Sequence, residues 1–230
     1  MPVKPVIKQE ALTAKGRLTR QRIVAAAAHL MFERGVARTS LDDVKRAADV
    51  SSSQLYHYFD DKSALVSAVI EFQTAAILAG QQPQLASLDS IPALRAWRDT
   101  LIGIRRHLRC QGGCPLGSLG SELADTDARA RAEVAAAMRT WESSIRDGLR
   151  AMHARGELAP SAKPDDLGMA IFAAVQGGIL LSQIYRETAP MEIALDTMID
   201  HIASLVVHPR KRRRRKMPGT DRHFRGRRPG

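Results

Sequence analysis

The sequence predicts an all-α fold, and both its composition and its periodicity support that prediction. Only 4% of the 230 residues are aromatic, whereas alanine recurs in runs at residues 25–28 and 135–137. Alanine, leucine and arginine favour helices, while aromatic and β-branched residues favour strands. Apolar residues recur every three or four positions along most of the chain, and no alternating pattern long enough for a strand occurs. We therefore expect a small N-terminal three-helix unit followed by a larger helical body.

Four helices are expected in the first 80 residues. Thr19 is predicted to cap the first helix, which ends at Gly35. Ser40 and Ser51 each begin a short helix, because each stands three residues before an Asp or Gln that completes a capping box. The fourth and longer helix begins at one of the two aspartates at 60–61.

Five further helices are expected after a break at residues 80–83, and glycine or proline separates most of them. Their predicted ranges are 90–109, 116–123, 126–155, 164–188 and 190–206. The most apolar stretch, residues 168–181, is 14 residues long and falls short of the ~20 needed to cross a bilayer. We interpret it as a buried helix, and we expect no contact with a membrane.

Charge is unevenly distributed along the chain, whose formal net charge is +11. Residues 209–230 carry eleven Lys or Arg and one Asp, and residues 1–22 carry six Lys or Arg and one Glu. The stretch between them has slightly more acidic than basic residues, so nucleic acid is the expected partner of the two ends. The expected parts are a flexible basic arm (1–18), the three-helix unit (19–65), the helical body (66–207) and a disordered basic tail (208–230).

Residues 39–62 have the pattern of a helix-turn-helix, in which two short helices are joined by a tight turn at Asp49. The second helix is about 12 Å long, which is close to the width of the DNA major groove. Its apolar side, formed by Val50, Leu55 and Phe59, is predicted to pack on the first helix. Its other side carries only uncharged hydrogen-bonding or aromatic groups, which are suited to reading base edges.

This segment resembles the TetR family of bacterial transcriptional regulators. The matching residues are Ala27, Leu30, Gly35, Thr39-Ser40, Val44, Val50-Ser51, Leu55-Tyr56-x-Tyr58-Phe59 and Lys62-x-x-Leu65. Residues 113–122 and 176–178 are similar to the C-terminal part of one subgroup of that family. Two positions depart from its pattern, because Lys45 replaces a small alanine and Asp49 replaces a glycine. We expect Asp49 to adopt a positive φ and the Lys45 stem to lie along apolar surface with its ammonium in water.

The resemblance implies a role for each polar residue of this unit. Base contacts are implied at Ser51, Ser52, Ser53 and Tyr56. Phosphate contacts are implied at Thr39, Ser40, Gln54, His57, Tyr58 and Lys62. The basic residues Lys15, Arg17 and Arg20 are expected to reach the DNA backbone or the minor groove. The alternative is that the aromatic residues are core and that His57 is an ordinary solvated side chain.

The helical body is expected to bind a small apolar effector in a pocket between its helices. The candidate pocket residues are Trp97, Leu101, Ile104, Leu116, Leu119, Met138, Trp141, Phe172, Gln176 and Ile179. The alternative for each of them is packed core, because apolar helix faces serve both purposes.

A metal or redox site is suggested only by His107, Cys110 and Cys114. Three ligands are one short of a closed zinc site, and the two cysteines do not form a CxxC pair. We interpret both thiols as structural, with a thiol sensor and a metal site as alternatives, and we expect a reducing cytoplasm. The sequence contains no phosphate-binding glycine loop, nucleophile elbow or metal-ligand spacing, so neither an enzyme nor a cofactor is expected.

These features predict a dimeric, effector-responsive regulator that binds a palindromic operator and acts, by family default, as a repressor. A single recognition helix reads few base pairs, so specific binding needs two half-sites and a two-fold dimer. The predicted dimer surface lies in helices 164–188 and 190–206, which the resemblance places in a four-helix bundle. Its small residues are Gly168, Ala173, Ala174, Gly177 and Gly178. The alternative function is a DNA-architectural protein that binds through its basic ends with little sequence preference.

Overall fold

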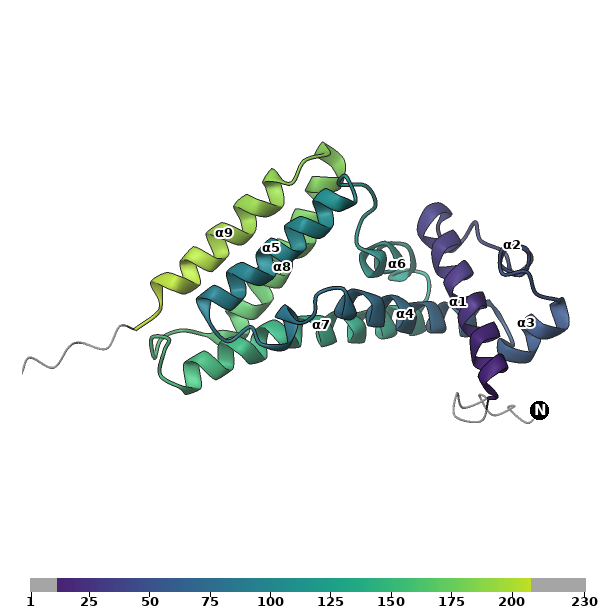
Figure 1. Cartoon of the computed structure of the whole chain (residues 1–230), viewed down its shortest axis with the longest axis horizontal. Coiled ribbons are helices and arrows are strands. Elements are labelled where there is room, and N and C mark those ends of the chain that lie inside the picture. The colour runs from purple at the N-terminus through teal and green to yellow at the C-terminus, as the bar shows by residue number, and fades with distance from the viewer. Residues whose placement is uncertain (1–11, 208–230) are drawn as a thin grey trace, which may run out of the picture.

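The structure, a computed structural model, describes residues 12–207. This range forms nine α-helices and one short 3-10 helix, and its only extended pairing is an isolated bridge between Leu158 and Val206 (Figure 1). The α-helices are α1 (Ala14–Arg34), α2 (Leu41–Ala47), α3 (Ser52–Tyr58), α4 (Lys62–Ala79), α5 (Ile91–His107), α6 (Pro115–Leu123), α7 (Ala128–Ala154), α8 (Pro164–Tyr185) and α9 (Ala189–Ser204). The all-α prediction is confirmed for this part of the chain.

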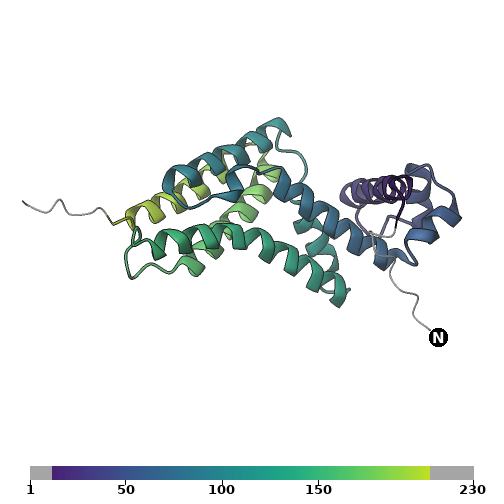
Figure 2. The same ribbon diagram turned by 60° about the horizontal axis from the view of Figure 1, so that its bottom comes forward.

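Helices α1, α2 and α3 form a small unit at one end of an elongated molecule (Figures 1 and 2). Both predicted capping boxes are present, at Ser40 and at Ser51, and they fix where α2 and α3 begin. Asp49, in the turn between these helices, adopts a φ of 49°, as expected. The predicted helix-turn-helix is therefore formed by local signals in the chain.

The first helix begins earlier than predicted. Its N-cap is Thr13, whose hydroxyl accepts a hydrogen bond of 3.1 Å from the Gly16 N–H. Thr19 lies inside the helix and donates its own hydroxyl to the Lys15 carbonyl at 3.1 Å, as threonine can do in a helix interior. The predicted flexible arm is therefore wrong for residues 13–18, while residues 1–11 lie outside the described range, as does the predicted basic tail.

The fourth helix, α4, joins the small unit to the body without a break at the predicted domain boundary of residue 65. Its first half packs against α1 through the buried Leu65 and Val69. Its second half packs against α7 in the body. One continuous helix therefore belongs to both parts.

The body is a bundle of α5, α7, α8 and α9, with the short α6 between the bundle and the small unit (Figure 1). Gln81 is a buried polar residue at its centre. Its side-chain oxygen accepts hydrogen bonds from the indole N–H groups of Trp97 (2.9 Å) and Trp141 (3.1 Å). Its amide N–H donates to the Ile77 carbonyl at 2.9 Å, so this amide links α4, α5 and α7.

Helix α8 is longer than the predicted apolar core segment and is not buried all round. By length and composition alone, α4 and α8 would each suffice to cross a membrane. One side of α8 packs in the core through Ile171, Val175 and Ile179. Its opposite side exposes Met169 and Ile184, among other apolar residues, because a single chain offers that side no partner. The prediction of a buried helix is therefore correct for one side only.

Candidate nucleic-acid interface and effector cavity

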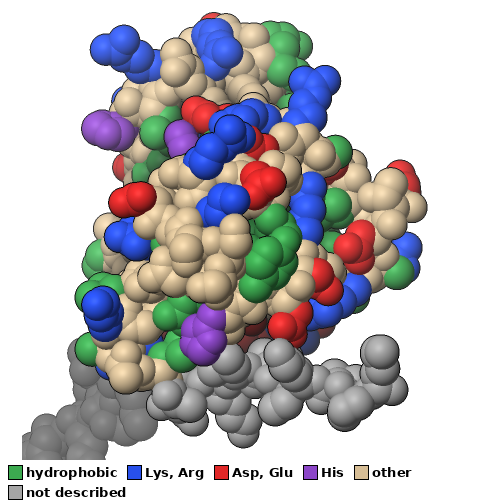
Figure 3. Space-filling view, turned by 90° about the vertical axis from the view of Figure 1, so that its right-hand side faces the viewer, with side chains coloured by type: hydrophobic (Ala, Val, Ile, Leu, Met, Phe, Trp, Pro, Cys, Tyr) green, Lys and Arg blue, Asp and Glu red, His purple; other side chains and the backbone are tan. Residues whose placement is uncertain are grey.

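The recognition helix α3 has one buried side and one exposed side. Leu55 and Phe59 are buried against the rest of the small unit, whereas 55% of Tyr56 is exposed. The serines 51–53 are exposed beside Tyr56. Figure 3 views the molecule from this end, where Lys and Arg side chains alternate with acidic ones. Tyr56 is therefore available to DNA, and the core alternative holds for Phe59.

Ser51 and Gln54 cap the first turn of α3, and each still has a hydrogen-bond donor that the cap does not use. The Ser51 hydroxyl accepts the Gln54 N–H at 3.1 Å, and the Gln54 side-chain oxygen accepts the Ser51 N–H at 2.9 Å. This arrangement leaves the Gln54 amide N–H₂ as a donor, and the Ser51 O–H remains a donor as well when Ser53 supplies the proton of the 3.4 Å contact between the two hydroxyls. Both residues can therefore serve the cap and the DNA together.

The expected side-chain contact of Thr39 with phosphate is not supported. Thr39 is only 1% exposed, and its hydroxyl donates to the Gly35 carbonyl at 2.8 Å. Lys62 is half-buried, and its ammonium donates to the Val36 carbonyl at 2.5 Å. An ammonium has three donors, so Lys62 keeps two for a phosphate, whereas Thr39 stabilises the loop between α1 and α2.

Ser40, His57 and Tyr58, the three other residues expected to contact phosphate, differ in exposure and in the bonds they already make. Ser40 is exposed, but its hydroxyl donates to the Asp43 carboxylate at 2.6 Å, and this bond and the Ser40 N–H lower the pKa of Asp43 to about 2. Its hydroxyl is therefore committed to the α2 cap. His57 is exposed, and its ring meets the half-buried Tyr58 ring edge-on at 4.8 Å. Of these three side chains, His57 is the most accessible to a phosphate, because it is exposed and Ser40 is already bonded to Asp43.

The two arginines expected on the N-terminal arm lie on α1. Arg17 is exposed and donates to the Leu12 carbonyl at 2.7 Å. Arg20 places its guanidinium carbon 5.3 Å from the ring centre of Phe59, the residue that ends α3. Both are thus carried by a rigid helix rather than by a flexible arm.

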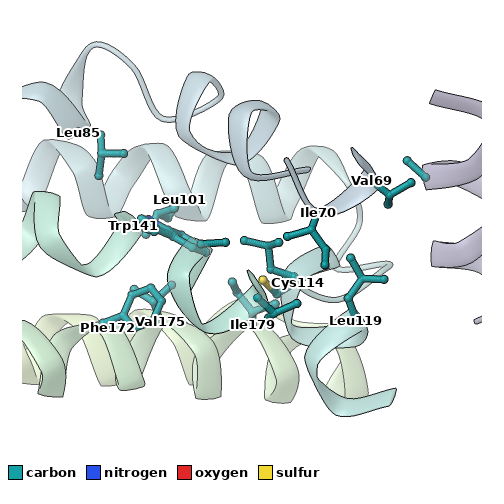
Figure 4. Packing of buried hydrophobic residues seen from close by; sticks show 14 of the residues in the cluster. Val69, Ile70, Leu85, Leu101, Cys114, Leu119, Trp141, Phe172, Val175 and Ile179 are labelled. Atoms are coloured by element: carbon teal, nitrogen blue, oxygen red, sulfur yellow. The ribbon is translucent and has the colours of Figure 1, made fainter. Parts of the chain in front are cut away.

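The body contains a cavity of about 190 Å³ between α4, α5, α6, α7, α8 and α9. Four predicted pocket residues line it: Leu101, Ile104, Trp141 and Ile179. The other six are not among its lining residues: Trp97, Leu116, Leu119, Met138 and Phe172 pack in or against the surrounding core, and Gln176 is half-buried on α8. Figure 4 shows the apolar packing around this region. Apolar periodicity identifies the inner face of a helix, but it does not separate cavity wall from packed core.

Several lining residues were not predicted. They are Ala76, Ile77, Gly80, Gln81, Arg105, Leu108, Gly113, Cys114, Pro115 and Met191. A larger hollow of about 630 Å³ lies between α1 and α4, away from the bundle, where Arg17, Arg20 and Glu71 line it.

Profiles of known families match both parts of the chain. The family described as bacterial regulatory proteins, tetR family, matches residues 23–69. The tetracyclin repressor-like C-terminal domain matches residues 90–198. The chain belongs to the TetR family. It is a transcriptional regulator with a helix-turn-helix DNA-binding domain, and not an enzyme.

Individual TetR-type relatives align over most of the chain. The transcriptional regulator AcuR of Cereibacter sphaeroides is 28% identical over 190 residues, which cover 81% of this chain and 86% of AcuR. The HTH-type transcriptional repressor DhaR of a Mycobacterium species is 24% identical over 183 residues, covering 79% and 90%. A TetR transcriptional regulator from Chloroflexus aurantiacus has a crystal structure that is 27% identical, with a TM-score of 0.73, and covers 84% of this chain and 98% of its own.

Lys45, one of the two departures from the TetR pattern, does not simply extend into water. Its ammonium donates to the Asp42 carboxylate at 2.7 Å and to the Ser52 hydroxyl at 3.2 Å. It thereby contacts the first residue of the recognition helix. The sequence interpretation missed this contact, although Lys45 and Ser52 are only seven positions apart on either side of the turn.

Glu122 is a second missed residue of this TetR-family chain. It lies near the end of α6, and its carboxylate accepts the N–H groups of Val36 (2.7 Å) and Ala37 (2.6 Å). These bonds tie α6 to the loop between α1 and α2. No signal in the local sequence indicates a partner 86 positions away.

The two cysteines are free and buried. Cys114 is the N-cap of α6, and its sulfur accepts the Gly117 N–H at 3.4 Å. Burial raises the pKa of the Cys114 thiol, which keeps it protonated at neutral pH. No cluster of three potential metal ligands occurs within residues 12–207. These contacts favour the structural interpretation of Cys114.

Proposed function

We propose that this protein is a homodimeric repressor that binds a palindromic operator in the cytoplasm and is released by a small effector. The observation that carries the proposal is the exposed, uncharged face of α3, held in place by a buried opposite side. A surface of serine, glutamine and tyrosine can distinguish base edges, whereas a purely basic surface would bind any sequence. The name of one relative, the repressor DhaR, supports repression.

The proposed dimer interface is the outer surface of α8 and α9. Leu180 and Ile184 of α8 and Ile193 of α9 are more than half exposed. Contiguous apolar surface of this kind marks an interface between subunits. Gly177 lies on the same exposed side, and a Cβ built there would meet nothing within 4 Å. This space allows a partner helix to approach closely.

Two of the predicted small interface residues have a different role. A Cβ at Gly168 would lie 3.0 Å from Arg146 of α7, and one at Gly178 would lie 2.8 Å from Met191 of α9. These glycines therefore permit close packing within one chain. Of the predicted set, Ala173 and Gly177 are exposed and remain candidates for contact with the partner.

We propose that the effector acts through α4 and α6, which both line the cavity. Lys62 at the start of α4 and Glu122 near the end of α6 both bond to Val36, which lies in the loop between α1 and α2. An effector that prefers another arrangement of these helices shifts the spacing of the two recognition helices. It can shift the equilibrium only by its difference in affinity for the two states.

The test is selection of bound sequences from random duplex DNA by the full-length protein. We expect enrichment of one palindrome with two half-sites. As a matched control, the protein without residues 209–230 should bind all DNA more weakly but select the same palindrome, because α3 is unchanged. Even enrichment of all sequences, or loss of the palindrome on truncation, would instead support the architectural alternative.

A further inference from the structure

Arg105 is a buried cation that has no acidic partner within residues 12–207. It lies on α5, is only 5% exposed and lines the effector cavity. One terminal nitrogen, Nη2, donates to the carbonyls of Gln111 (3.2 Å) and Gly112 (2.6 Å). Within residues 12–207, Arg105 forms no salt bridge, and its buried Nε has no hydrogen-bond partner. The neighbouring Arg106, in contrast, is paired with Glu192 at 2.7 Å.

The side chains around Arg105 include no carboxylate that pairs with it within residues 12–207. Burial lowers the pKa of its guanidinium, the nearby Cys110 and Cys114 act in the opposite direction, and the charge of Arg186 again lowers it. The unpartnered Nε of Arg105 is a hydrogen-bond donor, so the group that would satisfy it is an acceptor. A buried cation additionally favours an acceptor that carries negative charge.

The remaining cavity wall is apolar except for Gln81, whose amide is bonded to Ile77, Trp97 and Trp141. Leu101, Ile104, Trp141 and Ile179 contribute to it, and the Cys114 sulfur lies near Ile179 (Figure 4). The volume of about 190 Å³ is slightly larger than a cavity of ~150 Å³ that holds benzene. The site thus combines room for a short apolar body with one positive charge. A single guanidinium balances a monoanion, and its planar fork matches a carboxylate.

We propose that the effector is a small monocarboxylate whose charge is bound by Arg105. The inference rests on the proposed function, because it names the chemical class of the effector that the regulator detects. Arg105 has a structural task as well, since its Nη2 stabilises the loop in which Arg109 and Cys110 adopt positive φ values of 50° and 53°. Binding at the rest of the guanidinium would link effector charge to the loop that leads into α6.

The experiment measures the thermal stability of the full-length protein with two carboxylates and their neutral amides. Benzoate is compared with benzamide, and butyrate with butyramide, at constant ionic strength adjusted with NaCl. We expect at least one carboxylate to raise Tm in proportion to the logarithm of its concentration, and its amide to have little effect. Titration calorimetry should show about 10- to 100-fold weaker binding of that carboxylate to Arg105→Met.

Arg106→Met is the matched control, because it removes the same charge from an exposed neighbour on the same helix. It should retain the carboxylate response, and Arg105→Lys should retain part of it. If Arg105→Met fails to fold, the comparison of acid with amide on the parent still decides the question. Equal responses to acid and amide, no response to either carboxylate, or full binding to Arg105→Met would overturn the proposal.

Results that contradict the proposed function differ from results that contradict the carboxylate site. If a carboxylate binds through Arg105 but does not release the selected operator, the anion site stands and the effector role is wrong. If benzamide or butyramide releases the operator as well as its acid does, the regulator responds to ligands but the anionic class is wrong. The two conclusions are therefore separable in one set of measurements.

Discussion

The carboxylate of Glu122 on α6 accepts the backbone N–H of Val36, in the loop between α1 and α2, at 2.7 Å. The carbonyl of the same Val36 accepts the ammonium of Lys62 at the start of α4. One loop residue is therefore bonded to both helices that connect the cavity to the DNA-binding unit. Any movement of α4 relative to α6 must either move this loop or break one of these bonds.

Glu122→Gln should weaken this connection without unfolding the protein. The amide keeps one acceptor oxygen but loses the charge and one of two bonds, and a hydrogen bond to a charged group is worth about 1.5–3 kcal/mol. We expect faster amide hydrogen exchange in residues 35–40, measured by mass spectrometry, and a smaller effect of effector on operator affinity. Asp125→Asn, three residues further along the chain, is the control. Unchanged exchange in this loop would show that Glu122 does not hold it.

Tyr56→Ala should weaken operator binding while leaving stability unchanged. The side chain is 55% exposed on α3, and a good base contact is worth about 1–3 kcal/mol, or roughly 5- to 150-fold per half-site. Fluorescence anisotropy with the selected operator measures the loss. Leu55→Ala on the buried side should instead lower the free energy of unfolding by about 2–5 kcal/mol. Parent-like affinity of Tyr56→Ala would show that another face of α3 meets the DNA.

Lys45→Ala should change which sequences are selected. The substitution removes the bond of the ammonium to the Ser52 hydroxyl and frees that hydroxyl to contact a base or a phosphate. We expect altered preference at one base pair of each half-site, detected by repeating the selection, and a change in stability within about 0.5 kcal/mol. Arg46→Ala, which removes an exposed basic residue next to it, should leave the preference intact. An identical selected palindrome for Lys45→Ala would exclude a role in specificity.

Gly177→Leu should produce a folded monomer. The position is open in the single chain, so leucine obstructs only a partner helix. Gly178→Leu is the contrasting variant, because its side chain would collide with Met191 and destabilise α8 against α9. Sedimentation equilibrium gives the oligomeric state, and thermal unfolding gives the stability. A Gly177→Leu protein that sediments as a dimer would place the interface elsewhere.

Cys114 should react slowly with iodoacetamide in the folded protein. Burial raises its pKa, so the reactive thiolate is scarce at neutral pH and increases only as pH rises towards that raised value. Alkylation followed by mass spectrometry should show modification mainly after unfolding. The variant with both Cys110→Ser and Cys114→Ser should respond to effector as the parent does. Rapid modification of the native protein, or an oxidant response lost in the double variant, would favour a thiol sensor.

The sequence by itself determined the helices and the character of the recognition unit. Capping boxes at Ser40 and Ser51 and the turn at Asp49 depend on residues within a few positions of one another. The exposed side of α3 follows from helical periodicity alone, which is why Tyr56 was placed correctly. Even here, the start of α1 was misplaced, because its first turns are polar and lack the apolar period that marks a buried helix.

Only the tertiary structure decided which inward residues form a cavity and which charged groups lack partners. Periodicity placed Leu101 and Leu116 alike on inner faces, yet the first lines the cavity and the second is packed core. Within residues 12–207, the acids on the helices around Arg105 pair with other groups, as Glu192 of α9 does with Arg106. Glu122 meets Val36 across 86 positions of sequence. Such relationships arise from how separate helices pack, and no pattern within one helix encodes them.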